Sequence, residues 1–209
     1  MPAQFIPIHP DNPQPRLVAQ VVTVLRKGGV VAYPTDSSYA LGCHIGDKTA
    51  MDAIRRLRGL EDKHNFTLVC RDLSEIATYA RISNTAYRMI KSVTPGAYTF
   101  ILRATREVPR RLQHPRRRTI GIRVPDNAIC KALLDAMGEP LMSVSLMLPG
   151  EELPLSDAEE IREKMANGID VIVDGGACGY EPTTVVEWLD DEPVLVREGR
   201  GNIAALNLD

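Results

Sequence analysis

The chain has 209 residues, of which 44% are hydrophobic and 25% are charged. Both fractions are ordinary for a globular protein and the length suits one domain, so we expect residues 1–209 to form a single domain. The formal net charge is −2, which by itself indicates no charged partner, and no apolar run approaches the roughly 20 residues of a membrane span. Residues 1–15 lack the basic start and apolar core of a secretory signal, so we expect a cytoplasmic protein with no membrane partner.

Hydrophobic periodicity and breaker residues predict the elements of the first half of the chain. Gly28 is placed to end the first helix, and Asp47 is placed to cap the second. In chain order the predicted elements are a helix over 13–27, a strand over 30–33, a helix over 47–58, a strand over 66–70, short helices over 72–79 and 84–91, and a strand over 98–102.

The second half continues with strands and helices intermixed. The predicted elements are a strand over 119–124, a helix over 127–137, a strand over 140–146, a helix over 156–165, and strands over 171–173, 184–188 and 194–197. Gly138 is placed to end a helix, Ser156 and Glu159 have the spacing of a capping box, and the last two strands are expected to pair across Asp190-Asp191. Because several strands follow one another directly, we expect an α/β fold with a mixed sheet.

The cysteines and histidines form no metal-ligand pattern. The four cysteines lie far apart, no CxxC pair is present, and the four histidines are scattered. The pattern is more typical of buried thiols in a reducing compartment than of a redox or zinc site. The cysteines are Cys43, Cys70, Cys130 and Cys178.

Five short segments place hydroxyls, arginines or glycines at the ends of predicted strands. They are PTD at 34–36, TIGIRVP at 119–125, SVS at 143–145, PTT at 182–184 and REG at 197–199. Arginine offers a fork of donors to phosphates and carboxylates, and glycine lets backbone amides approach an anion. Neither a GxxxxGK[ST] loop nor a GxGxxG fingerprint is present. Taken alone, each segment is more typical of a turn or a half-exposed strand end.

The chain resembles the YrdC/YciO family in five segments that keep the family's order and spacing. PTDSSYALGC at 34–43 looks like its PT[DE]TxYGLG segment, TPGAYTFIL at 94–102 like PGPxTxIL, TIGIRVPDN at 119–127 like TxxxRxP, PTTVVE at 182–187 like PSTVVD, and VREG at 196–199 like IRxG. HPDNPQPRL at 9–17, HNFTLVCRDLSE at 64–75 and SLMLPG at 145–150 resemble the YciO branch more than the YrdC branch.

The resemblance implies a single-domain fold with a twisted mixed sheet, flanking helices and a concave, often basic face. It also implies a reaction. Active members of the YrdC branch make L-threonylcarbamoyladenylate from threonine, bicarbonate and ATP, release pyrophosphate, and so supply the threonylcarbamoyl group of tRNA adenosine 37. This chemistry needs positioning and charge stabilisation, with Mg²⁺ as an expected companion of ATP, and needs no covalent catalytic residue.

Eight residues of this chain match positions that hold the substrates in the family. By the resemblance, one group would contact threonine, and its arginine would pair with the threonine carboxylate. These residues are Thr35, Arg123, Ser143 and Thr183. A second group would contact the nucleotide, and its members are Arg58, Thr119, Ser145 and Arg197.

Three departures from the family pattern predict weakened activity. The family's KxR motif, whose cations hold the triphosphate, reads Arg58-Gly59-Leu60 here, and Lys63 is a further candidate cation. The asparagine of the family's SxN motif is replaced by Met147. Val69 or Cys70 stands where a histidine often ends the next strand. Two functions therefore stay open: a synthase with reduced activity, or a double-stranded RNA- or tRNA-binding paralogue without synthase activity.

A basic stretch lies between residues 103 and 123, where eight arginines accompany a single acid, Glu107. Such asymmetry is typical of a polyanion partner, and the resemblance makes RNA the first candidate. No aromatic residue interleaves these arginines, so contact with the RNA backbone is expected rather than base stacking. The alternative is a solvated loop paired with the acidic helix over 156–165. The predicted RNA-binding residues are Arg110, Arg111, Arg116, Arg117 and Arg118.

Overall fold

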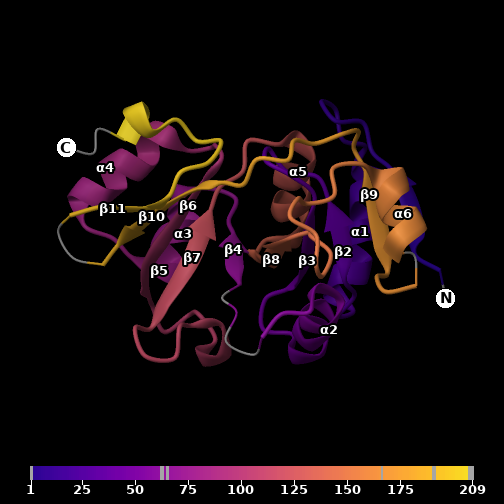
Figure 1. Ribbon diagram of the computed structural model, residues 1–209, viewed down its shortest axis with the longest axis horizontal. Helices are drawn as coiled ribbons and strands as arrows, with labels where there is room; N and C mark the ends of the chain where they lie inside the picture. Colours follow the sequence, from indigo (N-terminus) through magenta and orange to yellow (C-terminus); the bar gives the residue numbers. More distant parts are fainter. Residues whose placement is uncertain (1, 62–63, 65, 166, 190–191, 207–209) are drawn as a thin grey trace.

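A computed structural model describes residues 2–61, 64, 66–165, 167–189 and 192–206 of the chain (Figure 1). The strands are β1 (Gln4–Pro7), β2 (Val31–Tyr33), β3 (Ala40–His44), β4 (Thr67–Val69), β5 (Ala80–Arg81), β6 (Tyr98–Ala104), β7 (Thr119–Arg123), β8 (Leu141–Ser145), β9 (Val171–Asp174), β10 (Thr184–Trp188) and β11 (Val194–Arg197). The α-helices are α1 (Pro15–Arg26), α2 (Lys48–Arg58), α3 (Leu73–Tyr79), α4 (Asn84–Val93), α5 (Ala128–Met137) and α6 (Ala158–Met165). Short 3₁₀ turns cover Arg110–Leu112 and Ile203–Leu206. Within these ranges, no helix combines the length and apolarity needed to cross a membrane.

The strands form one sheet in the order β1-β9-β2-β3-β8-β4-β7-β6-β10-β11, and β5 pairs with β6 beside this path. Parallel pairs, such as β4 with β7, alternate with antiparallel pairs, such as β3 with β8. Strands β10 and β11 are antiparallel, as expected, while the predicted turn at Asp190-Asp191 lies outside the described residues. The twisted mixed sheet flanked by helices is therefore confirmed (Figure 1).

The helix ends follow short-range chemistry in most places. The carboxylate of Asp47 accepts a hydrogen bond of 2.9 Å from the amide of Ala50, and Gly138 ends α5 in the left-handed conformation, as predicted. The prediction that Ser156 caps α6 is wrong. The side chain of Asp157 accepts the amides of Glu159 and Glu160 instead, so the helix begins one residue later.

Three strands, β1, β3 and the short β5, are not among the elements that the sequence predicts. Strand β3 contains Gly42, which normally weakens a strand. Here a Cβ on Gly42 would lie 2.7 Å from the ring of Tyr33, so the glycine lets the neighbouring strand β2 approach with its aromatic ring. The β2–β3 hairpin brings the polar turn at 34–38 to the end of the sheet.

The core has two parts, one on each face of the sheet. Strand β9 shows the division, because Val171 and Val173 belong to one part and Ile172 to the other. Helices α1 and α5 pack on the first face, and α2, α3, α4 and α6 pack on the second. Figure 1 shows β10 and β11 at one end of the sheet beside α4, and β9 at the other end beside α6.

Candidate functional site

Five neighbouring strands present alternate side chains to a cavity of about 490 Å³. This is the α1–α5 face of the sheet, because Val69 and Ala40 line the cavity and also belong to that part of the core. A Cβ on Gly121 would lie 3.1 Å from the Thr67 hydroxyl, so the lack of a side chain at this position leaves space in the cavity. The floor consists of Ser143 and Ser145 of β8, Thr67 and Val69 of β4, Thr119, Gly121 and Arg123 of β7, Thr99 and Ile101 of β6, and Thr183 and Val185 at the start of β10.

All eight residues that the resemblance assigned to small-molecule binding line this one cavity. They come from segments up to 162 positions apart in the sequence, and the sheet order brings these segments together. Their individual roles stay predictions. The eight residues are Thr35, Arg58, Thr119, Arg123, Ser143, Ser145, Thr183 and Arg197.

Arg58, the last residue of α2, is a buried cation in the cavity wall. It is 8% exposed, and among the described residues its Nε has no hydrogen-bond partner and no carboxylate forms an ion pair with it. Burial lowers the pKa of this guanidinium. An unpaired buried charge is unfavourable, so Arg58 favours the binding of an anion in this cavity.

Arg197 reaches the cavity from the end of β11. Its Nε and Nη2 donate to the carbonyl oxygen of Thr183 at 3.2 and 3.0 Å, and the Thr183 hydroxyl lies 2.8 Å from that of Thr99. Burial lowers the pKa of Arg197 as well. No carboxylate among the described residues pairs with it, so its charge is also available to a ligand.

Arg123 differs from these two arginines because it already forms an ion pair with Asp36. Its Nη2 donates to the carboxylate of Asp36 and its Nη1 to the hydroxyl of Ser37 at 3.2 Å. The other oxygen of Asp36 accepts the amide of Asp126 at 2.9 Å. Arg123 therefore faces the cavity with its orientation fixed and its charge compensated, and a substrate carboxylate would have to share it with Asp36.

The predicted hydroxyl ligands are partly used within the protein. The Thr35 hydroxyl donates to the carbonyl of Ser38 at 2.7 Å. The Ser143 hydroxyl accepts from Tyr33 at 2.7 Å and lies 3.1 Å from the carbonyl of Leu41, to which it donates. Both hydroxyls keep the turn and the strands in place, whereas no such contact holds the Thr119 side chain within the described part of the chain.

The positions that depart from the family pattern lie in different surroundings. Met147 and Val69 line the cavity, so the missing asparagine and histidine are replaced there by apolar atoms. Leu60 instead packs against the core, because the left-handed Gly59 turns the chain after α2. Lys63 lies outside the described residues.

Several cavity residues are not among the site residues that the sequence predicts. His64, Phe66, Glu152 and Tyr180 line the cavity from segments that the eight matched positions do not include. Arg55 of α2 lies over the ring of Phe66, with 5.3 Å between its guanidinium carbon and the ring centroid. The available signal for this part of the site was a histidine and a phenylalanine within the ten residues that follow an arginine-rich helix end.

The cavity offers little to a metal ion held by the protein. Glu152 is the single carboxylate among the described residues that line it, and the described chain contains no cluster of three or more His, Cys, Asp or Glu side chains suited to a metal. These residues do not fit a protein-held Mg²⁺.

The buried thiols were predicted correctly for Cys43, Cys70 and Cys130, and burial raises the pKa of half-buried Cys178 to about 11.

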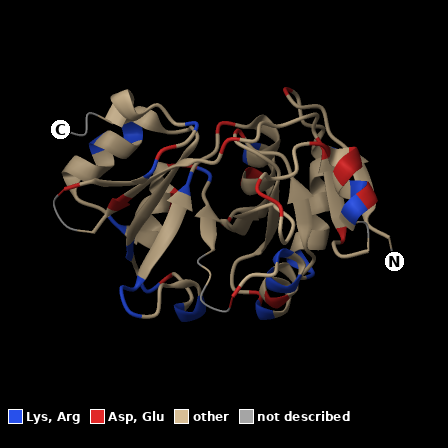
Figure 2. Ribbon diagram, viewed as in Figure 1, with Lys and Arg blue, Asp and Glu red and all other residues tan. Residues whose placement is uncertain are grey.

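The arginine loop, residues 105–118 between β6 and β7, buries Val108 and Leu112 and exposes its arginines. Arg117 donates to the carboxylate of Glu187 in β10 at 2.6 Å. The alternative in which the acidic helix pairs with this loop is wrong, because the recorded ion pairs of α6 are internal and α6 lies at the other end of the molecule (Figure 2). The other predicted RNA-binding arginines have no ion pair among the described residues, and they are Arg110, Arg111, Arg116 and Arg118.

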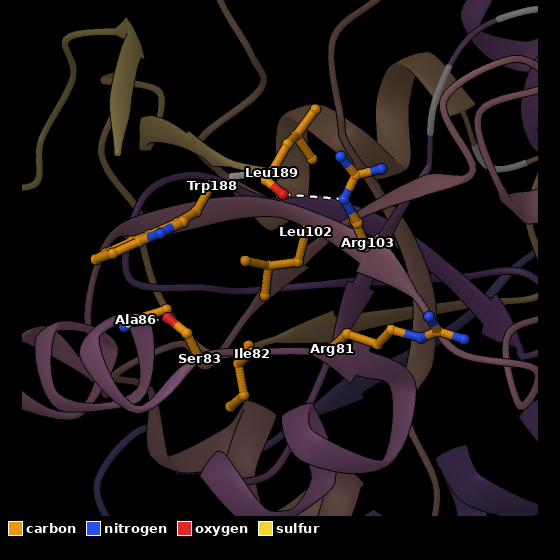
Figure 3. A pocket seen from close by; sticks show the side chains of 8 residues that line it. All are labelled: Arg81, Ile82, Ser83, Ala86, Leu102, Arg103, Trp188 and Leu189. Carbon is orange, nitrogen blue, oxygen red and sulfur yellow. Dashed lines mark hydrogen bonds between the residues drawn. The ribbon is translucent and has the colours of Figure 1, made fainter. Parts of the chain in front are cut away.

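A second cleft, of about 450 Å³, lies on the other face of the sheet, on which α4 packs (Figure 3). Trp188 and Leu102 form its apolar wall, and the Nε of Arg103 donates to the carbonyl of Leu189 at 2.9 Å. None of the residues that the sequence singled out for small-molecule binding lines this cleft. The candidate site is therefore the cavity on the α1–α5 face.

Comparison with known proteins agrees with this geometry. The family model described as "Telomere recombination" (Sua5, YciO and YrdC) matches residues 23–199. YciO of Escherichia coli K12 is 58% identical over 201 residues, which cover 96% of this chain and 98% of that protein. The crystal structure of E. coli YciO superposes with a TM-score of 0.94 at 57% identity, covering 98% of this chain and 99% of that one. A threonylcarbamoyl-AMP synthase of Halorhodospira halophila is 29% identical over 192 residues, covering 91% and 94% of the two chains. The chain belongs to the Sua5/YciO/YrdC family, and its pattern is that of the YciO branch.

Proposed function

We propose that this protein binds ATP and threonine in the cavity of the α1–α5 face and forms threonylcarbamoyladenylate at a rate below that of the family's dedicated synthases. The observation that supports this proposal most directly is Arg58, a buried cation without a carboxylate partner among the described residues, in a cavity lined by all eight matched positions. Relatives that share the fold and 29% of the sequence are named as threonylcarbamoyl-AMP synthases.

The residues suit a reaction that needs positioning and charge rather than a nucleophile. Threonine's amine combines with bicarbonate to give a carbamate and water. A carbamate oxygen then attacks the α-phosphorus of ATP, the bond to the β-phosphate oxygen breaks, and pyrophosphate leaves. Arg58 and Arg197 would stabilise the phosphate oxygens during this transfer, and Arg123 would orient the threonine carboxylate.

The reduced rate follows from the cavity wall. Met147 offers no amide to the phosphates, and Leu60 packs against the core rather than lining the cavity. Losing one preorganised donor to transition-state charge costs roughly 10²–10³ in rate. The expected enzyme therefore turns over slowly but binds its nucleotide.

Incubation of the purified protein with ATP, threonine and labelled bicarbonate tests the proposal. We expect a labelled adenylate whose formation requires threonine, and a slower reaction with Arg197→Gln. Arg200→Gln is the matched control, because Arg200 follows the same strand and does not line the cavity. Absence of any threonine-dependent adenylate at high protein concentration would reject the synthase function.

RNA binding by the arginine loop is a second candidate function, and it is independent of catalysis. The loop arginines are exposed, and the loop packs beside the start of α2, where a Cβ on Gly46 would lie 3.3 Å from the guanidinium of Arg111. Lys48 and Arg56 of α2 are also exposed, so the basic surface extends across two elements (Figure 2). A double-stranded RNA or tRNA backbone would fit this charge pattern.

A further inference from the structure

His64 lies in the wall of the same cavity, beside the unpaired Arg58. Its ring meets Phe66 edge-on, with 6.3 Å between ring centroids and an interplanar angle of 87°. Arg55 lies over the other ring of this pair, so two guanidinium groups of α2 surround an aromatic and an imidazole side chain. These four residues form the α2 cation cluster, of which Arg58, His64 and Phe66 line one end of the cavity while Arg55 pairs with Asp52 at 3.3 Å.

The electrostatics of this cluster favour a neutral imidazole. His64 is exposed at the cavity wall. Its partial burial there lowers its pKa, and the charges of Arg58 and Arg55 lower it further. Glu152 is the acid among the described residues of the cavity wall, and the backbone carbonyl of Glu61 accepts the His64 amide at 3.0 Å. Partial burial and the positive charges of Arg58 and Arg55 therefore both favour the neutral ring at pH 7.

We propose that His64 takes up a proton when phosphate groups bind at the α2 cation cluster, and that the protonated ring then donates a hydrogen bond to the anion. This inference rests on the nucleotide function proposed above for the same cavity. Because Arg55 already pairs with Asp52, the phosphate is opposed mainly by Arg58, and it carries more negative charge than this one arginine compensates, so its arrival makes the local field negative. His64 then supplies a cation that the family pattern would place at position 60, where this chain has a leucine.

The sign of the pH dependence follows from proton linkage. The free protein holds the proton of His64 weakly, and the complex holds it more tightly. Phosphate binding is therefore strongest below the His64 pKa of the free protein, and the gain is lost as the pH rises through the raised pKa of the complex. A shift of one pKa unit corresponds to a tenfold change in affinity.

Proton NMR titration of the imidazole signals, with and without inorganic pyrophosphate, tests the proposal directly. The chain has four histidines, and His64→Gln assigns the signal. We expect pyrophosphate to raise the pKa of His64 by about one unit or more and to leave those of the other three nearly unchanged. An unmoved His64 signal, or no pyrophosphate binding at all, would overturn the proposal.

Calorimetric affinities between pH 5.5 and 8.5 provide the second measurement. Pyrophosphate itself titrates in this range, but it does so equally for wild type and His64→Gln, so the difference between them isolates the histidine. We expect the variant to bind about tenfold more weakly at the acid end and alike at the alkaline end. His9→Gln, in the loop after β1, is the control and should follow wild type.

The outcomes separate this inference from the proposed reaction. Proton uptake by His64 in a protein that forms no adenylate would reject the synthase and keep the histidine role. If adenylate forms but pyrophosphate affinity has the same pH dependence in wild type and His64→Gln, the synthase function is kept and the histidine role is rejected.

Discussion

The cavity and the arginine loop both concentrate positive charge, but without a ligand this charge destabilises the folded protein in the cavity and hardly affects its stability in the loop. Arg58 is 8% exposed and lacks a carboxylate partner among the described residues, which is unfavourable unless an anion arrives. The loop arginines are in water, where their charge costs almost nothing and even an ion pair such as Arg117 with Glu187 contributes little. One buried, unpaired cation therefore indicates a ligand more strongly than several exposed ones.

The largest effect on stability is expected from removing the carboxylate that pairs with Arg123 beside the cavity. Asp36→Asn removes the partner of Arg123, whose side chain is 9% exposed, and leaves a buried cation unpaired. We expect the free energy of unfolding to fall by roughly 3–5 kcal/mol in urea denaturation at pH 7. Asp135→Asn breaks the exposed pair with Lys131 and should cost less than about 1 kcal/mol. Equal losses in the two variants would show that burial does not distinguish these pairs.

Arg58→Met should have opposite effects on binding and on stability. Removing the cation from the α2 cluster is expected to weaken ATP binding by about 10²-fold, measured by calorimetry, because a charge-assisted contact of roughly 2–3 kcal/mol is lost. The same change should raise the melting temperature of the free protein, since an unpaired buried charge disappears. Arg56→Met, exposed on the same helix, should alter neither quantity. A destabilised Arg58→Met protein would mean that Arg58 supports the fold instead.

The arginine loop should respond to substitution only in RNA binding. Replacing Arg110 and Arg111 with alanine is expected to weaken binding to double-stranded RNA about tenfold at moderate salt, and to reduce the slope of log affinity against log salt by roughly 2. Stability should stay unchanged, because both side chains are exposed. Arg88→Ala with Lys91→Ala, exposed on α4, is the matched control. Equal affinity for all three proteins would remove the loop from any RNA interface.

Met147→Asn is expected to have the smallest effect, a few-fold increase in the rate of adenylate formation. The new amide would line the cavity but would lack the supporting contacts of a preorganised donor, whose loss costs roughly 10²–10³. Leu60→Arg is not expected to add to it, because Leu60 packs against the core. A rate unchanged or lowered by Met147→Asn would show that this position does not face the phosphates.

Much of the fold and the eight matched site residues could be predicted from the sequence. The fold followed from the local pattern of apolar residues, and the site residues followed from short motifs. The period of apolar residues located α2 and α5, and the motifs located residues such as Thr119 and Arg197 in the cavity. What failed depended on contacts between distant residues. The ion pair of Arg123 with Asp36 joins strand β7 to the turn between β2 and β3, and the sequence does not show that these two segments lie close together.

The missed features have the same physical origin. Strand β3 contains a glycine that only the ring of Tyr33 explains, and His64 belongs to the site only because α2 ends beside it. Ser156 and Asp157 are both good capping residues, and the choice between them depends on how the preceding loop packs, since Ser156 is buried.

Alternation along the floor strands separates two tasks within single elements. In β7, Ile120 and Ile122 belong to the core on one side, while Thr119, Gly121 and Arg123 face the ligand space on the other. Changes on one side leave the other side's packing largely intact. A lineage can thus exchange floor residues, and with them the molecules it accepts, while the folding information in the intervening positions is inherited unaltered.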